Sequence, residues 1–164
     1  MTDSQIGRTA GGGFRERIAA DEPVQAIAFD IAGERHACDV LLVEEVATKL
    51  RIHPLPDMPP RLLGVVRLRG ELVPVVDVAP LLSLSLTAAA PHVLVVESEG
   101  LRVAVAADYV HDVVTLPPGS YRAAPGGDAY VAAVARVDGT LYTLVDLAEV
   151  LREQTTPVLR GSEP

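Results

Sequence analysis

Several residue types that mark common protein classes are scarce in this chain of 164 residues. Cys38 is the only cysteine, which excludes an intrachain disulfide and a zinc site built from several thiolates. There is no tryptophan and aromatic residues make up 4%, so the core must be aliphatic. Lys49 is the only lysine and the formal net charge is −8, which argues against nucleic acid or an anionic membrane as the partner. No apolar run approaches the ~18 residues of a membrane span.

The two ends of the chain are polar. Residues 1–23 are glycine-rich and have no basic start followed by an apolar stretch, so we expect a flexible tail without a secretory signal peptide. Residues 152–164 are expected to form a short C-terminal tail. The folded domain should therefore span residues 24–151, and we expect the protein to be cytoplasmic.

Short valine-rich runs separated by turn residues fill the folded part and predict a mostly β protein. Arg69-Gly70 and Asp138-Gly139 each lie between two apolar runs, which is typical of tight hairpins. Short helices are expected at residues 40–46, 78–82 and 147–152. Strands at this spacing indicate small barrels or a sandwich rather than alternating βαβ units.

The sequence contains an internal repeat. Residues 61–82 align with residues 130–151 at a shift of 69, which matches Arg67 with Arg136, Gly70 with Gly139 and Asp77 with Asp146. Residues 33–46 align with residues 100–113 at a shift of 67, in the same order. Chance alignment of valine-rich strands is the alternative, but it does not explain the matched polar positions. Two copies of one β unit predict two subdomains around a shared aliphatic core, covering about residues 25–86 and 92–151. An exchange of chain ends between them stays open.

Residues able to carry catalysis are few. Asp77 and Asp146 end equivalent strands and could form a carboxylate pair for acid–base chemistry, or cap the short helices that follow. Their repeat-related positions favour capping. Cys38 replaces an apolar strand residue and is expected in the core. None of the histidines has metal-site spacing; they are His36, His53, His92 and His111. We therefore predict a protein that is not an enzyme and binds no metal or cofactor.

Three segments of the chain, residues 29–46, 64–78 and 102–113 with 144–147, resemble the CheW-like family of bacterial chemotaxis adaptors. The most specific runs Gly64-Val65-Val66-Arg67-Leu68-Arg69-Gly70-Glu71-Leu72-Val73-Pro74-Val75-Val76-Asp77-Val78. The resemblance covers about residues 25–151. It implies two tandem five-stranded barrels resembling SH3 folds, with short helices. It also implies a cytoplasmic scaffold, associated with the membrane only through receptor arrays, that links chemoreceptor tips to the histidine kinase CheA. Other CheW copies in an array could be further partners.

The resemblance also implies two contact surfaces. Glu45 and Arg69 match the family's charged pair. The receptor groove is matched by Val43, Val46, Arg69, Val110 and Val113, and the alternative is that the four valines are plain core residues. A kinase-binding surface on the first barrel is placed at Ile52, Leu55, Met58 and Gly64.

Some residues depart from the family pattern. Arg67 stands where asparagine is usual, and Tyr109 fills a variable position with a large ring. Alanine replaces a common glycine at Ala37, Ala104 and Ala133. These departures leave open a divergent protein of a non-flagellar chemosensory pathway that keeps one of the two contacts. A small-barrel ligand-binding module is the alternative from another class.

Overall fold

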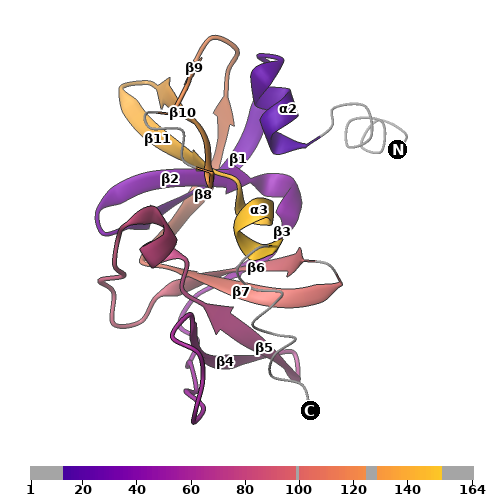
Figure 1. The fold of residues 1–164 in the computed structure, drawn as a ribbon, viewed down its shortest axis with the longest axis vertical. Coiled ribbons are helices and arrows are strands. Elements are labelled where there is room, and N and C mark those ends of the chain that lie inside the picture. Colours follow the sequence, from indigo (N-terminus) through magenta and orange to yellow (C-terminus); the bar gives the residue numbers. More distant parts are fainter. Residues whose placement is uncertain (1–12, 99, 125–128, 153–164) are drawn as a thin grey trace.

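The computed structural model describes residues 13–98, 100–124 and 129–152, and it consists of two stacked β-sheets (Figure 1). The upper sheet contains β1 (Val24–Ile31), β2 (Glu34–Asp39), β8 (Tyr109–Leu116), β9 (Tyr121–Arg122), β10 (Val131–Val137) and β11 (Thr140–Val145). The lower sheet contains β3 (Val43–Ala47), β4 (Leu62–Leu68), β5 (Glu71–Val76), β6 (His92–Ser98) and β7 (Leu101–Ala107). The strand orders are β8-β1-β2-β11-β10-β9 and β3-β6-β7-β5-β4.

Each sheet curls around its own apolar cluster, so we call the two units the upper and the lower barrel. Alanine, valine and leucine side chains fill the upper cluster, and valines and alanines fill the lower one. A third and larger cluster lies between the barrels and takes residues from both, such as Phe29 of β1 and Val105 of β7. The alternation of apolar residues along the strands explains this arrangement, because successive side chains point to opposite faces. The predicted mostly β fold with two barrels and a shared aliphatic core is confirmed.

The described residues include four short helical segments beside the barrels: α2 (Phe14–Ala19), η1 (Val40–Leu42), η2 (Ala79–Leu82) and α3 (Leu147–Val150). The prediction of a flexible tail is wrong for α2, whose Phe14 and Ile18 are buried against the upper barrel. A helix of six residues in a glycine-rich context is too short to show a clear helical period. Residues 1–12 and 153–164 lie outside the described part of the chain.

The helix predicted over residues 40–46 is also wrong in its second half. Only η1 is helical, and β3 begins at Val43 and pairs with β6. The sheet pairing overrides a local pattern that fits a helix equally well. The predicted hairpin turns are confirmed, because Arg69 and Asp138 adopt φ of 49° and 51° and each is followed by a glycine at positive φ.

The two repeat units exchange strands. β1 and β2 of the first unit join the upper barrel with β8, β10 and β11, whereas β3, β4 and β5 join the lower barrel with β6 and β7. Each barrel therefore combines the first two strands of one unit with the later strands of the other. The barrels do not coincide with the two halves of the sequence, and the exchange of chain ends that the sequence left open takes this form.

Strand register confirms the repeat residue by residue. Ala28 pairs with Ala37 between β1 and β2, and the residues 67 positions later, Val95 and Ala104, pair between β6 and β7. The parallel contact of Ala37 with Leu144 corresponds to that of Ala104 with Val75. Irregularities of register also recur at matching places in β8 and β3. The two barrels are thus pseudo-equivalent, so a residue in one can be compared with its counterpart in the other.

Candidate functional site

Arg69 and Glu45 form an ion pair on the lower barrel, with 2.6 Å between Arg69 Nη1 and Glu45 Oε1. Arg69 lies in the turn after β4 and Glu45 on β3, and these two strands are the edges of the sheet. The structure thus brings the predicted charged pair together, although Glu45 lies on a strand rather than at a helix end. Because the Arg69 side chain is 78% exposed, the attraction is screened by solvent and contributes little to folding stability.

The corresponding positions of the upper barrel carry two acids. The repeat alignment matches Arg69 with Asp138 and Glu45 with Asp112. Asp138 occupies the same left-handed turn position as Arg69, and Asp112 lies on the edge strand β8. The ion pair therefore distinguishes the lower barrel from its pseudo-equivalent partner.

The four candidate groove valines split into two pairs. Val110 is 9% exposed within the interbarrel cluster, and Val43 packs against that cluster, so these two are core residues or close to it. Val46 and Val113 are 40% and 51% exposed. Each of them lies opposite a residue of the interbarrel cluster in the neighbouring strand, so both side chains stand on the side where the barrels meet. Val46 belongs to the lower barrel and Val113 to the upper.

The residues expected at a kinase surface lie between β3 and the start of β4. Leu55 is 47% exposed, whereas Ile52 and Met58 are half-buried. Gly64 is buried at φ +150°, and a Cβ there would lie 2.4 Å from the carbonyl oxygen of His53. Gly64 therefore acts through its backbone, because it lets the loop pair with β4 through His53.

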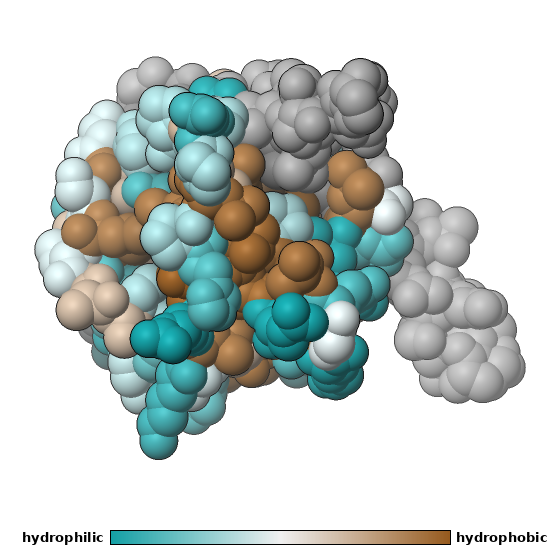
Figure 2. All heavy atoms as spheres, turned by 90° about the horizontal axis from the view of Figure 1, so that it is seen from below, coloured by the Kyte–Doolittle hydropathy of each residue, from teal (hydrophilic) through white to brown (hydrophobic). Residues whose placement is uncertain are grey.

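Apolar side chains reach the surface of the lower barrel. Seen from below, they form a band bordered by hydrophilic residues (Figure 2). Among the charged residues of this barrel, Arg102 on β7 makes ion pairs with Glu44 on β3 and Glu71 on β5. Apolar area with a charged border is the composition of a protein-binding surface.

Tyr109 is 51% exposed at the start of β8, and its ring centroid lies 4.7 Å from those of His92 and His111. His111 Nε2 lies 2.8 Å from Asp30 Oδ2, and Arg35 pairs with the other oxygen of that carboxylate at 2.6 Å. Burial opposes ionisation of Asp30, but hydrogen bonds and charge from His111 and Arg35 outweigh it and hold the pKa of Asp30 below its ordinary value. The Tyr109 ring therefore contacts two histidine rings, one of which, His111, is held by Asp30.

The other departures from the family pattern fit the fold without strain. Ala37, Ala104 and Ala133 are buried, and none of them has a positive φ, so alanine is sterically acceptable there. Arg67 is exposed on β4.

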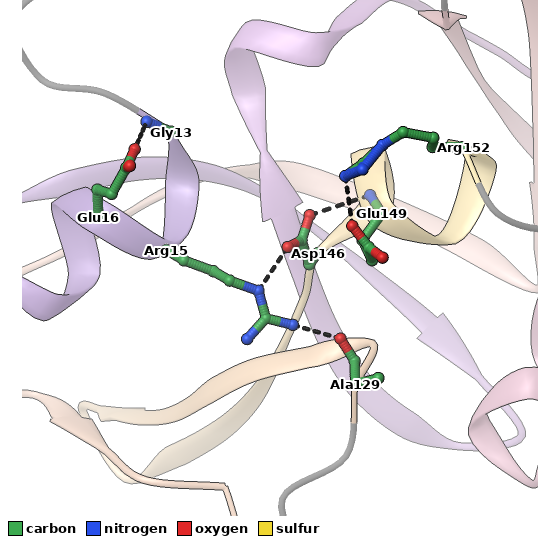
Figure 3. Close-up of polar contacts among 7 residues, drawn as sticks. All are labelled: Gly13, Arg15, Glu16, Ala129, Asp146, Glu149 and Arg152. Atoms are coloured by element: carbon green, nitrogen blue, oxygen red, sulfur yellow. Dashed lines mark hydrogen bonds and ion pairs between the residues drawn. The ribbon is translucent and has the colours of Figure 1, made fainter.

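A cleft of about 590 Å³ lies between α2, η1 and α3. Arg15 of α2 reaches Asp146 and the carbonyl oxygen of Ala129 (Figure 3), and its Nε lies 2.5 Å from Asp146 Oδ2. Asp146 also accepts the N–H of Glu149 at 3.2 Å, and Glu149 in turn pairs with Arg152. Asp146 thus caps α3 and fastens α2 to it.

A second ion pair holds α2 against the upper barrel. Arg17 Nη2 lies 2.5 Å from Asp39 Oδ2, and the two side chains are 12% and 8% exposed. Neither α2 nor its two ion pairs, Arg15–Asp146 and Arg17–Asp39, is among the predictions made from the sequence. The spacing of Phe14 and Ile18 by four residues is the signal that could have indicated α2.

The remaining candidates for chemistry have structural roles. Asp146 is the N-cap of α3, as predicted. Asp77 lies one residue before the N-cap of η2 and accepts the N–H of Ala79 at 3.0 Å. Cys38 is fully buried in the interbarrel cluster, and burial raises the pKa of its thiol to about 12. Within the described ranges there is no group of three or more histidine, cysteine, aspartate or glutamate side chains that could hold a metal ion. No helix in those ranges is long and apolar enough to cross a bilayer.

Known proteins resemble this chain in sequence and in fold. The model of the CheW-like domain family matches residues 25–155. The chemotaxis protein CheW of Rhizobium meliloti is 28% identical over 135 residues, covering 77% of this chain and 86% of that protein. The CheW of Bacillus subtilis is 23% identical over 137 residues, covering 79% and 88%. The crystal structure of the scaffolding protein TtCheW from Thermoanaerobacter tengcongensis superimposes with a TM-score of 0.69 at 24% identity, covering 79% of this chain and 92% of that one.

Two pseudo-equivalent SH3-like barrels, packed through an aliphatic core and carrying exposed apolar and charged contacts, define a binding scaffold. The chain belongs to the CheW-like domain family. It is a non-enzymatic scaffold protein of bacterial chemotaxis signalling, as the sequence predicted.

Proposed function

We propose that this protein couples the cytoplasmic tips of chemoreceptors to the regulatory domain of a CheA-type histidine kinase, and that it works at receptor arrays in the cytoplasm. Membership of the CheW-like family supports this role. The observation that carries it is the exposure of Val46 and Val113 at repeat-related positions, one on the edge strand of each barrel.

The receptor surface spans both barrels. Val46 and Val113 stand on the side where the barrels meet. Glu45 is the neighbour of Val46 on β3, and it pairs with Arg69 in the turn after β4. An apolar contact from each barrel suits a helical receptor segment, whose apolar side chains recur on one face. The exposed Arg69 adds a charge that selects the orientation of the partner.

The kinase surface lies on the lower barrel. Leu55 is its exposed apolar residue, and Ile52 and Met58 on the same segment are half-buried. Because this surface involves one barrel and the receptor surface involves two, the contacts can be separated by mutation.

Binding of the full-length chain to purified receptor tips and to the CheA regulatory domain tests the proposal. Val46→Glu and Val113→Glu should each weaken receptor binding by about tenfold or more, because a charge is buried without a partner. Leu55→Glu should weaken kinase binding instead. Leu141→Glu changes a side chain that is 50% exposed outside both surfaces and is the matched control.

Each outcome is decisive. A wild-type chain that captures neither partner at micromolar concentrations overturns the proposed function. Binding of the kinase without the receptor, or the reverse, limits the role to the single contact that is retained. Equal losses in the control and the test variants would show that the chosen surfaces are wrong.

A further inference from the structure

In the part of the chain that the structure describes, the backbone crosses between the barrels twice. It leaves the upper barrel after β2, through η1, and enters the lower barrel at β3. It returns from β7 to β8 through a single residue, Asp108. The two crossings are pseudo-equivalent, because Asp108 aligns with Leu41 of η1.

The Asp108 carboxylate accepts hydrogen bonds from both barrels. Its Oδ2 accepts the N–H of Ala32, in the turn between β1 and β2 of the upper barrel, at 2.7 Å. Its Oδ1 accepts the N–H groups of Thr87 and Ala88, on the segment leading into β6 of the lower barrel, at 2.7 and 2.8 Å. The Thr87 hydroxyl donates to Oδ2 at 2.9 Å. A few residues away, His92 Nδ1 accepts the N–H of Val110 at 2.9 Å, which adds a second bond between the barrels.

The other crossing is held differently. Asp39 precedes η1, and its carboxylate accepts hydrogen bonds from the Arg17 guanidinium and from the N–H of Leu41. Arg17 belongs to α2, which packs on the upper barrel, so this anchor does not reach across to the lower barrel. Leu41 itself is 54% exposed. The crossing at Asp108 is therefore the one where a side chain ties the two barrels together.

Such a tie matters because the interbarrel cluster is aliphatic. Hydrophobic contact is strong but has no direction, so it holds the barrels together without fixing their relative angle. Hydrogen bonds to a carboxylate are directional and charge-assisted, and they select one arrangement. Val46 and Val113 lie on different barrels, so their separation depends on that angle.

We propose that Asp108 is a positioning residue for receptor binding: by tying the β1–β2 turn to the segment before β6, it sets the separation of the two halves of the receptor surface. This inference rests on the proposed function. Kinase binding, which involves the lower barrel alone, is independent of Asp108.

Asp108→Asn tests the tie with little change of volume. An asparagine has one carbonyl oxygen, so it can accept from Ala32 or from the Thr87 and Ala88 pair, but not from both sides. We expect receptor affinity to fall by roughly tenfold, the size of a lost hydrogen bond to a charged group, and kinase affinity to stay within about twofold. Thr87→Val removes the hydroxyl bond alone and should give a smaller loss in the same direction. Asp39→Asn, at the other crossing, should lower the melting temperature but leave the ratio of the two affinities unchanged.

A distance measurement tests the positioning without any partner. Spin labels on a Val46→Cys, Val113→Cys chain report the separation of the two barrels, since Cys38 is buried and its thiol is protonated. The distance distribution should broaden or shift with Asp108→Asn and stay unchanged with Asp39→Asn. An unchanged distribution, or equal losses of receptor and kinase binding in a folded Asp108→Asn chain, overturns the inference while the proposed function stands. A wild-type chain that binds no receptor overturns the proposed function, even if the distances shift as expected.

Discussion

Arg69 in the turn after β4 reaches Glu45 on β3 and bridges the two edges of the lower barrel, with 2.6 Å between Nη1 and Oε1. The arginine is largely in solvent, so the geometry is defined while the gain in stability is small. This combination fits a contact residue better than a structural one, and it leads to the first two predictions.

Arg69→Glu should leave the fold intact and weaken receptor binding. The substitution removes a screened pair and places a like charge beside Glu45, so the free energy of unfolding should change by no more than about 1 kcal/mol. Urea denaturation followed by circular dichroism, together with receptor pull-down, checks both parts. Arg67→Glu, an exposed change on β4, is the control. Global unfolding of the Arg69→Glu chain would mean that the ion pair is structural instead.

Asp138→Arg should stabilise the protein by supplying the upper barrel with the ion pair that the lower barrel already has. The new arginine would sit at the position equivalent to Arg69 and face Asp112, which is equivalent to Glu45. A gain of about 0.2–1 kcal/mol is expected at low salt, and it should shrink at high salt. Urea midpoints at two salt concentrations measure it. If the same gain persists when Asp112→Asn is added, the stabilisation does not come from this pair.

Cleavage of the chain between Ala89 and Ala90 should leave the two halves associated. Both residues are exposed in the segment before β6, so a protease site placed there can be cut in the folded protein. Because each barrel takes strands from both halves, neither fragment can complete a barrel alone. Size-exclusion chromatography should show one species after cleavage, and two fragments only in denaturant. Separation of the fragments in native buffer would contradict the exchanged strand order.

Stability should fall as the pH drops below about 5, because Asp30 and Asp108 are ionised in the folded state. Burial of Asp108 disfavours the charged form, but the N–H groups of Ala32, Ala88 and Thr87 outweigh it and lower the pKa. Folded pKa values below the unfolded value of about 3.9 stabilise the protein above that pH, and the contribution is lost as pH falls through the folded values. Urea midpoints from pH 7 to pH 3 should decline, and less steeply in the Asp108→Asn chain. If the urea midpoints of the wild-type and Asp108→Asn chains decline in parallel, Asp108 does not contribute to the pH dependence.

Local sequence signals were sufficient to predict the hairpins and the repeat. Glycine after Arg69 and after Asp138 marks turns that need positive φ, and valine-rich alternation marks the strands on either side. The cap of α3 at Asp146 and the bond from the Ala79 N–H to Asp77 follow from the same local chemistry. These features depend on neighbours in the chain, so they can be read without knowing the rest of the fold.

The exchange of strands could not be predicted in this way. β1 and β6 are copies with the same pattern, so the sequence does not say whether β3 pairs with one or the other. Only the packing of the whole chain selects β6. The tie at Asp108 follows from that choice, because it joins segments that become neighbours only after the exchange. The predicted pairing of Glu45 with Arg69 matches the structure, but Glu45 was expected in a helix and lies on strand β3. The reason is similar, because β3 forms only by pairing with β6.

The exchanged strands also bear on how such a chain could arise. A single copy of the unit could complete both barrels only by associating with a second copy, as a symmetric homodimer in which every residue change would appear on both sides. Joining two copies through one covalent connection removes that constraint. One half could then acquire Arg69 while the other kept an aspartate at position 138, so a surface that a homodimer must present twice became free to specialise for one partner.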